Sequence, residues 1–389
     1  MAEQYDFVVI GSGISGAVAA ERLAKSGVHS VLVLDQASHV GGLCRTQWDE
    51  DHGLIVPIYG TRVIYTANST VADYLESIAP FRKFEHRLRA MVGTETYAIP
   101  INLETINRVY EANFDSRAAR AQLQIEAAEH EARNGSMQDA AISSMGTRLY
   151  ETFVRGFATK QLGEDPSKLS DELFKSRFPV RFDAEDRFAP FADWQALPVH
   201  GFHGLFDRLL GAENITVRMG VARDAIRSAI GICRKAVVYT GEIDAFFDFS
   251  EGPLDFRDNV VIWAPVKTSE AQKVAVLAHP DIDVPYFRTH APMHLPYNHN
   301  APASHMTLVG YELSGTTTVP ETLRNGVAYP YRFLAKTRAN IDRLRRYQKL
   351  ARAEEGILFL GRHSIPSPNI EQSIALSLDA VERIKERFE

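Results

Sequence analysis

A glycine-rich turn near the start of the chain limits its possible folds more than any other feature. An apolar run over 7–10, rich in β-branched residues, has the length of a buried parallel strand. The turn over 11–16 reads Gly-Ser-Gly-Ile-Ser-Gly, and an Ala-rich helical segment follows over 17–25. A second apolar run, 30–34, ends in Asp35. This order of strand, turn, helix, strand and acid predicts a dinucleotide-binding unit.

The turn has a chemical reason for each of its residue types. Gly11 permits a sharp bend, Gly13 lets a pyrophosphate approach the backbone, and Gly16 lets the helix pack closely against the strand. The N-terminus of the helix, which contains Ser15, offers unpaired N–H groups and a partial positive charge to phosphates. Asp35 can accept hydrogen bonds from ribose hydroxyls.

A further pair of glycines, Gly41 and Gly42, makes this pattern more specific. The whole stretch resembles the FAD-binding start shared by amine oxidases, phytoene desaturases and UDP-galactopyranose mutases. We therefore expect a bound nucleotide diphosphate here, with an empty βαβ turn as the alternative. The cofactor contacts expected in this part of the chain are Gly11, Gly13, Ser15, Gly16, Asp35, Gly41 and Gly42.

The composition is that of an ordinary globular protein, with 45% hydrophobic and 24% charged residues among 389. This length suggests two or three domains. The net charge of -6 argues against a broad nucleic-acid surface. The two cysteines, Cys44 and Cys233, form neither a disulfide framework nor a metal-binding set. Because no signal peptide precedes the first strand and no apolar run reaches about 18 residues, we expect a cytoplasmic protein with no membrane partner.

The expected elements indicate an α/β fold: a Rossmann-like dinucleotide-binding domain with an inserted helical domain and an antiparallel β-sheet domain. Residues 103–163 read as helical, 82–99 alternate as a hairpin does, and 178–182 are expected to form a strand. The apolar strand over 236–240 suits a return to the nucleotide domain. The expected boundaries are 1–68, 203–250 and 356–389 for the nucleotide domain, 102–172 for the helical domain, and 80–100, 175–202 and 255–345 for the β-sheet substrate domain.

Several short motifs, in the same order along nearly the whole chain, resemble those of the UDP-galactopyranose mutase family. The segment 156–163 (GFATKQLG) resembles the family's GYTEKQWG, and 179–182 matches its PVRF. The segment 239–248 (YTGEIDAFFD) resembles YTGPIDxYFD, and 284–288 (VPYFR) resembles VPYTR. The pair at 361–362 stands where the family has a late Gly-Arg.

The resemblance implies an isomerase that interconverts the pyranose and furanose forms of a nucleotide-diphosphate (NDP) hexose. In that family a reduced flavin attacks the anomeric carbon through N5 and displaces the nucleotide diphosphate, with no net redox change. Arginines would steady the diphosphate through charge-assisted contacts. Arg181 and Arg288 fall on matching positions and are the expected catalytic residues. Arg257 lies in a segment that resembles the family's LEYR. For each arginine, a surface salt bridge is the alternative.

Further contacts are expected from residues on or beside these motifs. Tyr329 precedes Pro330 as in the family's YYP, and either touches the diphosphate or only packs. Arg362, in the late Gly-Arg pair, joins the expected cofactor contacts. The expected substrate-binding residues are Arg257, Phe157, Leu162, Trp194, Tyr329 and Arg62.

The chain departs from the family around the expected position of the flavin ring. The family's GAHIFHT reads GTRVIYT over 60–66, so both histidines are absent and Arg62 introduces a cation. The tryptophan of KQWG is Leu162, and the family's tyrosine pair and Asp-Met are replaced in the stretch 364–370. Two alternatives stay open: FAD binds with an altered ring site, or the flavin has been lost.

A flavin-free mutase would need another way to ease the departure of the diphosphate. Arginines could neutralise the leaving group, and so could a divalent metal such as Mg²⁺ or Mn²⁺ held by substrate phosphates and carboxylates. One segment is rich in histidine, but its spacing matches no tight ligand motif, so the metal ligands stay unassigned. These histidines are His290, His294, His299 and His305.

Two other functions compete with the mutase. An FAD-dependent oxidoreductase of the amine-oxidase or desaturase type shares the N-terminal pattern, but it has no reason for several arginines aimed at a diphosphate. A nucleotide-sugar-binding protein without catalysis would explain the departures. The sequence names neither the base nor the hexose, and a GDP-sugar is one option. A homodimer is one option for the assembly.

Overall fold

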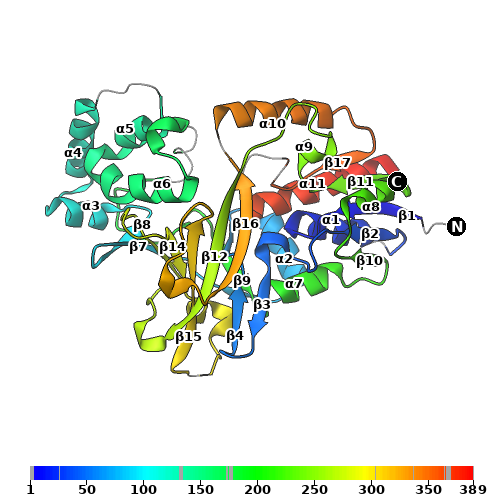
Figure 1. Ribbon diagram of the computed structural model, residues 1–389, viewed down its shortest axis with the longest axis horizontal. Coiled ribbons are helices and arrows are strands. Elements are labelled where there is room, and N and C mark those ends of the chain that lie inside the picture. Colours follow the sequence, from blue (N-terminus) through cyan, green and yellow to red (C-terminus); the bar gives the residue numbers. More distant parts are fainter. Residues whose placement is uncertain are drawn as a thin grey trace.

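The computed structural model describes residues 4–25, 27–130, 135–171, 174, 178–302, 304–335, 337–362, 364 and 369–388. A parallel sheet covered by helices lies at one end, a group of helices at the other, and a large sheet runs between and below them (Figure 1). The expected fold class is confirmed. The division into domains stays a prediction, although the sheets show which distant segments are joined by hydrogen bonds.

The first sheet is parallel and contains the N-terminal strand at its centre. Its strands, in spatial order, are β10 (Ile215–Arg218), β2 (Val31–Leu34), β1 (Tyr5–Ile10), β11 (Cys233–Tyr239) and β17 (Ile357–Phe359). These strands come from three separate parts of the chain. The predicted return of the 236–240 segment to the nucleotide-binding sheet is therefore correct.

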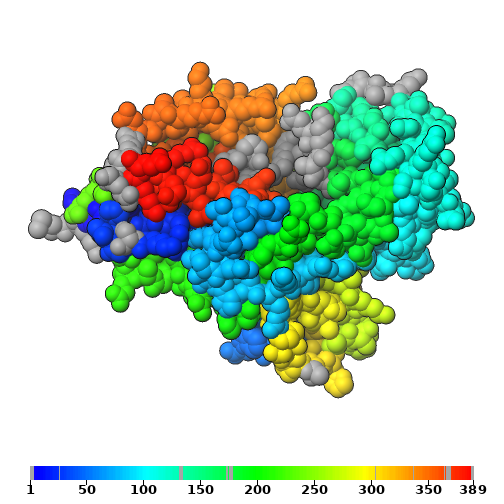
Figure 2. Space-filling view, turned by 180° about the vertical axis from the view of Figure 1, so that it is seen from behind, coloured from blue at the N-terminus to red at the C-terminus, as the bar shows by residue number. Residues whose placement is uncertain are grey.

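Both faces of this sheet are covered, which explains its near-continuous apolar strands. Phe7 and Val9 belong to the core that α1 (Ile14–Ala24) shares with other helices. Val8 and Ile10 point to the opposite face, where they pack with Ile226. The helices on the first face include α7 (Gly201–Leu210) and α11 (Ile370–Phe388), and α8 (Arg223–Ile230) covers the second face. From behind, α11 (red) lies against the N-terminal segment (blue) in Figure 2.

The second sheet is larger and is antiparallel except where β13 pairs with β7. Its order is β16 (Val327–Leu334), β12 (Phe256–Lys267), β15 (Met306–Ser314), β14 (Arg288–His290), β13 (Val276–Ala278), β7 (Leu88–Val92) and β8 (Glu95–Ile99). The predicted hairpin is present, because β7 and β8 pair across a turn at Gly93. This sheet carries Arg257 on β12 and Arg288 on β14.

The helical region stands at the end of the molecule away from the first sheet (Figures 1 and 2). It comprises α3 (Leu103–Tyr110), α4 (Ser116–Glu129), α5 (Met137–Leu149), a π-helical segment (Tyr150–Arg155) and α6 (Gly156–Leu162). Its apolar core includes Ala90 of β7 and Ala278 of β13. The helices therefore pack directly against one edge of the large sheet.

The remaining elements connect these parts. They are β3 (Thr46–Asp49) with β4 (Leu54–Pro57), β5 (Ile64–Thr66) with β9 (Trp194–Pro198) and β6 (Phe81–Lys83), and the helices α2 (Ser69–Ile78), α9 (Ile243–Phe246) and α10 (Arg338–Ala351). The segment 175–202, which we expected in the substrate domain, contains β9. This strand pairs with β5 and β6, and its Leu197 packs into the core of the first sheet, while the assignment to a domain stays a prediction.

The strand predicted over 178–182 is wrong. This segment makes only an isolated bridge between Val180 and Ile101. The N–H of Arg181 donates to the carbonyl of Ile101 at 2.8 Å, while Pro179 has no N–H to donate. The segment therefore satisfies one backbone group locally and does not extend into a ladder. In the described ranges, no helix combines the length and the apolar content needed to cross a lipid bilayer.

Candidate functional site

The glycine-rich turn closes tightly around the first residues of α1. Gly11 has φ +99°, and a Cβ there would lie 2.0 Å from Oγ1 of Thr240. A Cβ on Gly16 would lie 1.9 Å from the carbonyl oxygen of Gly11. Gly13 differs, because a Cβ there would meet nothing within 4 Å. Gly11 and Gly16 are thus required by packing, whereas Gly13, the N-cap of α1, faces open space.

The second pair of glycines lies against the first turn. Gly41 and Gly42 have φ of +108° and +51°. The N–H of Gly41 donates to the carbonyl of Ser12 at 3.1 Å, and a Cβ on Gly42 would lie 3.2 Å from Cα of Gly13. The two glycine segments therefore form one continuous wall of backbone at the N-terminus of α1.

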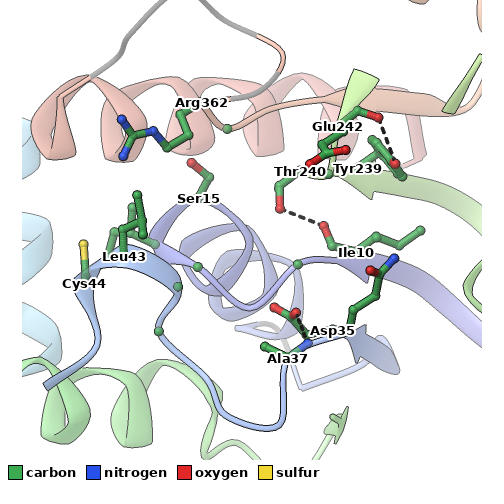
Figure 3. A pocket seen from close by; sticks show the side chains of 18 of the residues that line it. Ile10, Ser15, Asp35, Ala37, Leu43, Cys44, Tyr239, Thr240, Glu242 and Arg362 are labelled. Carbon is green, nitrogen blue, oxygen red and sulfur yellow. Dashed lines mark hydrogen bonds between the residues drawn. The ribbon is translucent and has the colours of Figure 1, made fainter. Parts of the chain in front are cut away.

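A cavity of about 570 Å³ opens at this wall. It extends from Asp35 and Ala37 at one end to Tyr59 and Tyr331 at the other. The predicted residues that line it are Gly11, Gly13, Ser15, Asp35, Gly41, Gly42, Arg62 and Arg362. Figure 3 shows Arg362 on the side of Ser15, Leu43 and Cys44, away from Asp35 and Ala37.

Asp35 is held in place by its own neighbours. Its Oδ2 accepts from the N–H and the hydroxyl of Ser12, each at 2.7 Å, and its Oδ1 accepts from the N–H of Ala37 at 2.9 Å. The carboxylate thus ties the end of β2 to the glycine turn. Its contact with a ribose stays a prediction, since it would use acceptor capacity that these bonds leave open.

Two arginines, Arg62 and Arg362, line the same part of the cavity as Cys44 and Tyr331. Arg62 donates to the carbonyl of Thr61 at 3.2 Å. Within the described residues, neither Arg62 nor Arg362 forms an ion pair with an acid. Burial and the nearby charge of Arg62 lower the pKa of Arg362. Burying cations without an anion is costly, so this end of the cavity is suited to a negatively charged ligand.

A buried carboxylate, Glu312 of β15, lies at the centre of a polar cluster close to these arginines. Its side chain is 0% exposed. Nη2 of Arg288 donates to its Oε1 at 3.1 Å, and Nε2 of His290 lies 3.0 Å from its Oε2. The hydroxyl of Tyr331 also donates to it. The same carboxylate therefore orients three side chains from β14 and β16.

Burial and the neighbouring charges shift the pKa values of the side chains in this cluster. Burial alone would raise the pKa of Glu312, but Arg288, His290 and Arg62 lower it far below its usual range. Burial, together with Glu312, raises the pKa of Tyr331 to about 12. Burial and the neighbouring arginines lower the pKa of His290. Near neutral pH the cluster therefore contains a carboxylate, a neutral imidazole and a neutral phenol.

A profile described as UDP-galactopyranose mutase matches residues 152–365, which is more than half of the chain. The chain belongs to the UDP-galactopyranose mutase family. This membership makes it an isomerase of the pyranose/furanose mutase class, as the motifs predicted. A second profile, described as NAD(P)-binding Rossmann-like domain, matches residues 9–78, where the glycine-rich turn lies.

Named relatives agree with this family. The chain is 31% identical to dTDP-fucopyranose mutase of Escherichia coli over 284 residues, which cover 72% of this chain and 74% of that protein. It is 28% identical to a probable UDP-galactopyranose mutase of Klebsiella pneumoniae over 365 residues, covering 92% and 88%.

Solved structures show the same fold. A crystal structure of reduced UDP-galactopyranose mutase superposes with a TM-score of 0.74 at 16% identity, covering 98% of this chain and 96% of that one. A putative protoporphyrinogen oxidase from Exiguobacterium gives a TM-score of 0.67 at 13% identity, covering 98% of each chain.

Among the arginines predicted from the family motifs, Arg181 and Arg257 lie away from the cavity of this mutase-family protein. Arg181 donates to the carbonyls of Arg187 and Phe188 at 2.6 and 3.1 Å, so it holds the 183–193 loop. Arg257 lies beside Gly163 at the end of α6. Arg288 is paired with Glu312, which also accepts from Tyr331 of the cavity lining. The roles predicted for these arginines stay predictions.

The other predicted substrate contacts do not line the cavity either. Phe157 packs edge-to-face on Phe287, and Leu162 is buried in the helical core. Nε1 of Trp194 donates to Glu76 at 2.7 Å, on the side of α2. Tyr329 packs against Tyr59, which does line the cavity. In the stretch after Arg362, residues 363 and 365–368 lie outside the described residues.

The histidines considered as metal ligands do not converge. His290 contacts Glu312, His294 contacts the carbonyl of Gln272, and His299 contacts Arg82. In the part of the chain that the structure describes, no group of three or more His, Cys, Asp or Glu side chains could hold a metal ion.

Sequence reasoning missed Glu312 and Tyr331. Glu312 is the one charged residue in the strand over 306–314, and a single acid among apolar and uncharged residues is a signal of a buried, paired carboxylate. Tyr331 follows the Tyr-Pro pair at which we expected a contact, and it is Tyr331 that lines the cavity. The neighbour relation between these two residues depends on pairing across β12 and was not visible in the sequence.

Proposed function

We propose that this protein interconverts the pyranose and furanose forms of an NDP-hexose, and that Arg62 and Arg362 hold the substrate's diphosphate. One observation carries the proposal: Arg62 and Arg362, which form no ion pair with an acid among the described residues, line a cavity that also contains a dinucleotide-type glycine turn. The profile match over residues 152–365 supports the same reaction class.

The charge balance of this region supports a diphosphate ligand. Arg62, Arg288 and Arg362 bring three positive charges, and Glu312 brings one negative charge, which leaves an excess of two. His290 and Tyr331 stay neutral near pH 7 because burial keeps one deprotonated and the other protonated. The diphosphate of an NDP-sugar is a dianion, so it would compensate this excess.

The arginines would act on the bond that breaks. Departure of the NDP from the anomeric carbon places negative charge on the diphosphate, and fixed guanidinium groups stabilise that charge in a site shielded from water. Glu312 would fix the direction of Arg288 and Tyr331 through the contacts described above. Arg181 would contribute from the helical side only after releasing the carbonyls of Arg187 and Phe188.

The cavity fits FAD at its dinucleotide end. Gly13 leaves open space at the N-terminus of α1, Gly42 lies against it, and Arg362 faces the same side without an anion. We propose that the N-terminus of α1, at Gly13 and Ser15, holds the pyrophosphate of FAD and that Asp35 contacts its ribose. When bound and reduced, FAD would supply the nucleophile that displaces the diphosphate. We favour FAD over a divalent metal, because the described residues offer no group of ligands for a metal.

The test is product analysis with a panel of UDP-, dTDP- and GDP-hexoses, separated by chromatography. We expect a furanose product from at least one of them, with activity that follows bound FAD and requires dithionite. Activity that persists without flavin and is lost with EDTA would replace FAD by a metal in the proposal. If no furanose forms from any sugar and an amine or alcohol yields hydrogen peroxide, the protein is an oxidase and the proposal is wrong.

A further inference from the structure

The loop that carries Arg62 contains no histidine, yet a histidine from β14 is packed beneath it. A Cβ on Gly60, at φ +84°, would lie 2.8 Å from Nε2 of His290. The N–H of Thr61 lies 3.2 Å from Nδ1 of the same ring. The imidazole of His290 is 1% exposed. It is therefore enclosed between the loop over 60–62 and the large sheet.

The partners of His290 fix its tautomer. Nδ1 accepts the N–H of Thr61, so Nδ1 carries no proton. Nε2 faces Oε2 of Glu312 at 3.0 Å, and the carboxylate is an acceptor, so Nε2 carries the proton and donates it. A neutral imidazole in this one orientation connects the buried carboxylate to the backbone of the loop.

We propose that His290 is the positioning residue of Arg62: it holds the loop over 60–62 in the conformation that presents Arg62 to the diphosphate. The inference rests on the proposed function, in which Arg62 binds that group. Thr61 directly precedes Arg62 in the loop, and without His290 its partly buried N–H would lose this acceptor. Without this hydrogen bond the loop loses its attachment to β14. The backbone of Arg62 is then no longer held in one position.

Substitutions at position 290 separate this role from simple filling of space. Asn presents an oxygen near the place of Nδ1, so it can accept from Thr61. Gln presents an N–H near the place of Nε2, so it can donate to Glu312 and not serve the loop. Leu can do neither. His279→Leu is the matched control, because His279 is also buried and bonds Thr289 at 2.9 Å, but it does not contact the loop.

The measurement is calorimetric titration of the FAD-loaded protein with dTDP and UDP. We expect Arg62→Ala to lower the affinity for the tighter-binding of the two nucleotides about tenfold or more, because a charge-assisted contact is lost. We expect His290→Leu and His290→Gln to weaken it about fivefold, and His290→Asn to stay within about twofold of wild type. His279→Leu should leave the affinity unchanged.

A double substitution shows whether His290 acts through Arg62. In the Arg62→Ala background, His290→Leu should cost less than about twofold more, because coupled residues are not additive. The proposal is overturned if the affinity losses of Arg62→Ala and His290→Leu add fully in the double variant. It is also overturned if His290→Gln retains as much affinity as His290→Asn. If His290→Leu does not fold, the difference in affinity between His290→Asn and His290→Gln still tests the positioning role. If Arg62→Ala weakens binding and every variant at 290 matches wild type, only the positioning role fails; if Arg62→Ala has no effect, the diphosphate role of Arg62 fails first.

Discussion

Gly13 and Gly16 stand three residues apart in one turn, but the structure gives them opposite roles. A side chain on Gly16 would collide with the backbone of Gly11, whereas a side chain on Gly13 would project into open space at φ −69°. Gly16 therefore serves the fold, and Gly13 leaves room for a ligand. This difference allows the binding of a dinucleotide to be tested apart from folding.

We predict that Gly13→Val folds as wild type does but loses cofactor binding. The valine would occupy the space at the N-terminus of α1 where a pyrophosphate would lie. Unfolding in urea should show a free energy within about 0.5 kcal/mol of wild type, as for substitutions that touch nothing. Binding of FAD, followed by quenching of its fluorescence, should weaken at least tenfold. Unchanged FAD binding by a folded variant would show that the turn is structural only.

Gly16→Ala is predicted to do the reverse. Its Cβ has no room beside the carbonyl of Gly11, so α1 must shift, and overpacking of this kind costs roughly 1–3 kcal/mol. We expect a lower urea midpoint and, in the fraction that folds, FAD affinity close to that of wild type. A stability equal to that of wild type would contradict the close packing described for this turn.

At the scale of single residues, the sequence predicted contacts only between residues that lie close together along the chain. The spacing of Gly11, Gly13 and Asp35 predicted their common place because strand, turn and helix follow one another directly. Glu312 and His290 were not predicted as a pair, since their contact depends on the register of β14 against β15. Arg181 matches a family motif, but the sequence did not show that two carbonyls of the 183–193 loop would engage its guanidinium.

At the scale of elements, α6 is fastened to the large sheet by one buried lysine. Nζ of Lys160 lies 2.6–3.1 Å from the carbonyls of His279, Asp281, Val284 and Tyr286. These carbonyls belong to the connection between β13 and β14, which ends at Arg288. The lysine thus determines the path of the VPYFR segment, and burial lowers its pKa to about 8.

We predict that Lys160→Met loosens this connection. Its removal leaves buried carbonyls without a donor, which costs about 1–3 kcal/mol or more. Hydrogen exchange of the amides over 279–287 should accelerate, while β1 and β11 stay protected. Lys168→Met is the control, because Lys168 is exposed and pairs with Glu164 at the surface, so stability should change by less than about 0.5 kcal/mol. Equal exchange in both variants would contradict the fastening role.

The sequence predicted which segments form helices and strands better than it predicted which strands pair with one another. The helices over 103–163 and the hairpin at Gly93 were expected from periodicity and turn chemistry. The segment 178–182 has the apolar and β-branched residues of a strand, but its backbone finds no neighbouring strand beyond one bridge. The pairing of β9 with β5 was not predicted, because strand pairing over a long sequence separation leaves no local pattern.

At the scale of the whole molecule, several histidines are buried in their neutral form. Burial lowers the pKa of His86 and of His279 to about 4, and it also lowers the pKa of His290. In the unfolded chain these rings would take up protons below about pH 6.5. Between pH 6.5 and 4 the unfolded state therefore binds more protons than the folded state, so stability falls as the pH falls.

We predict that His86→Leu weakens this sensitivity to acid. Each buried neutral histidine contributes a slope of about 1.4 kcal/mol per pH unit in this window, and the variant removes one of them. The measurement is the free energy of unfolding in urea at several pH values from 7 to 4.5. His305→Leu, at an exposed histidine, should keep the wild-type slope. An unchanged slope in His86→Leu would show that this ring is protonated in the folded state.

In the proposed function, the protein interconverts two ring forms of an NDP-hexose without net oxidation. Proton NMR of the anomeric signals tests it most directly, with the reduced, FAD-loaded protein added first to the pyranose and then, in a second sample, to the furanose of the same sugar. We expect both samples to reach one common ratio of the two forms, since a catalyst does not change an equilibrium. If each sample keeps its starting ring form for every UDP-, dTDP- and GDP-hexose tried, the protein is not a mutase of these sugars and the proposed function is wrong.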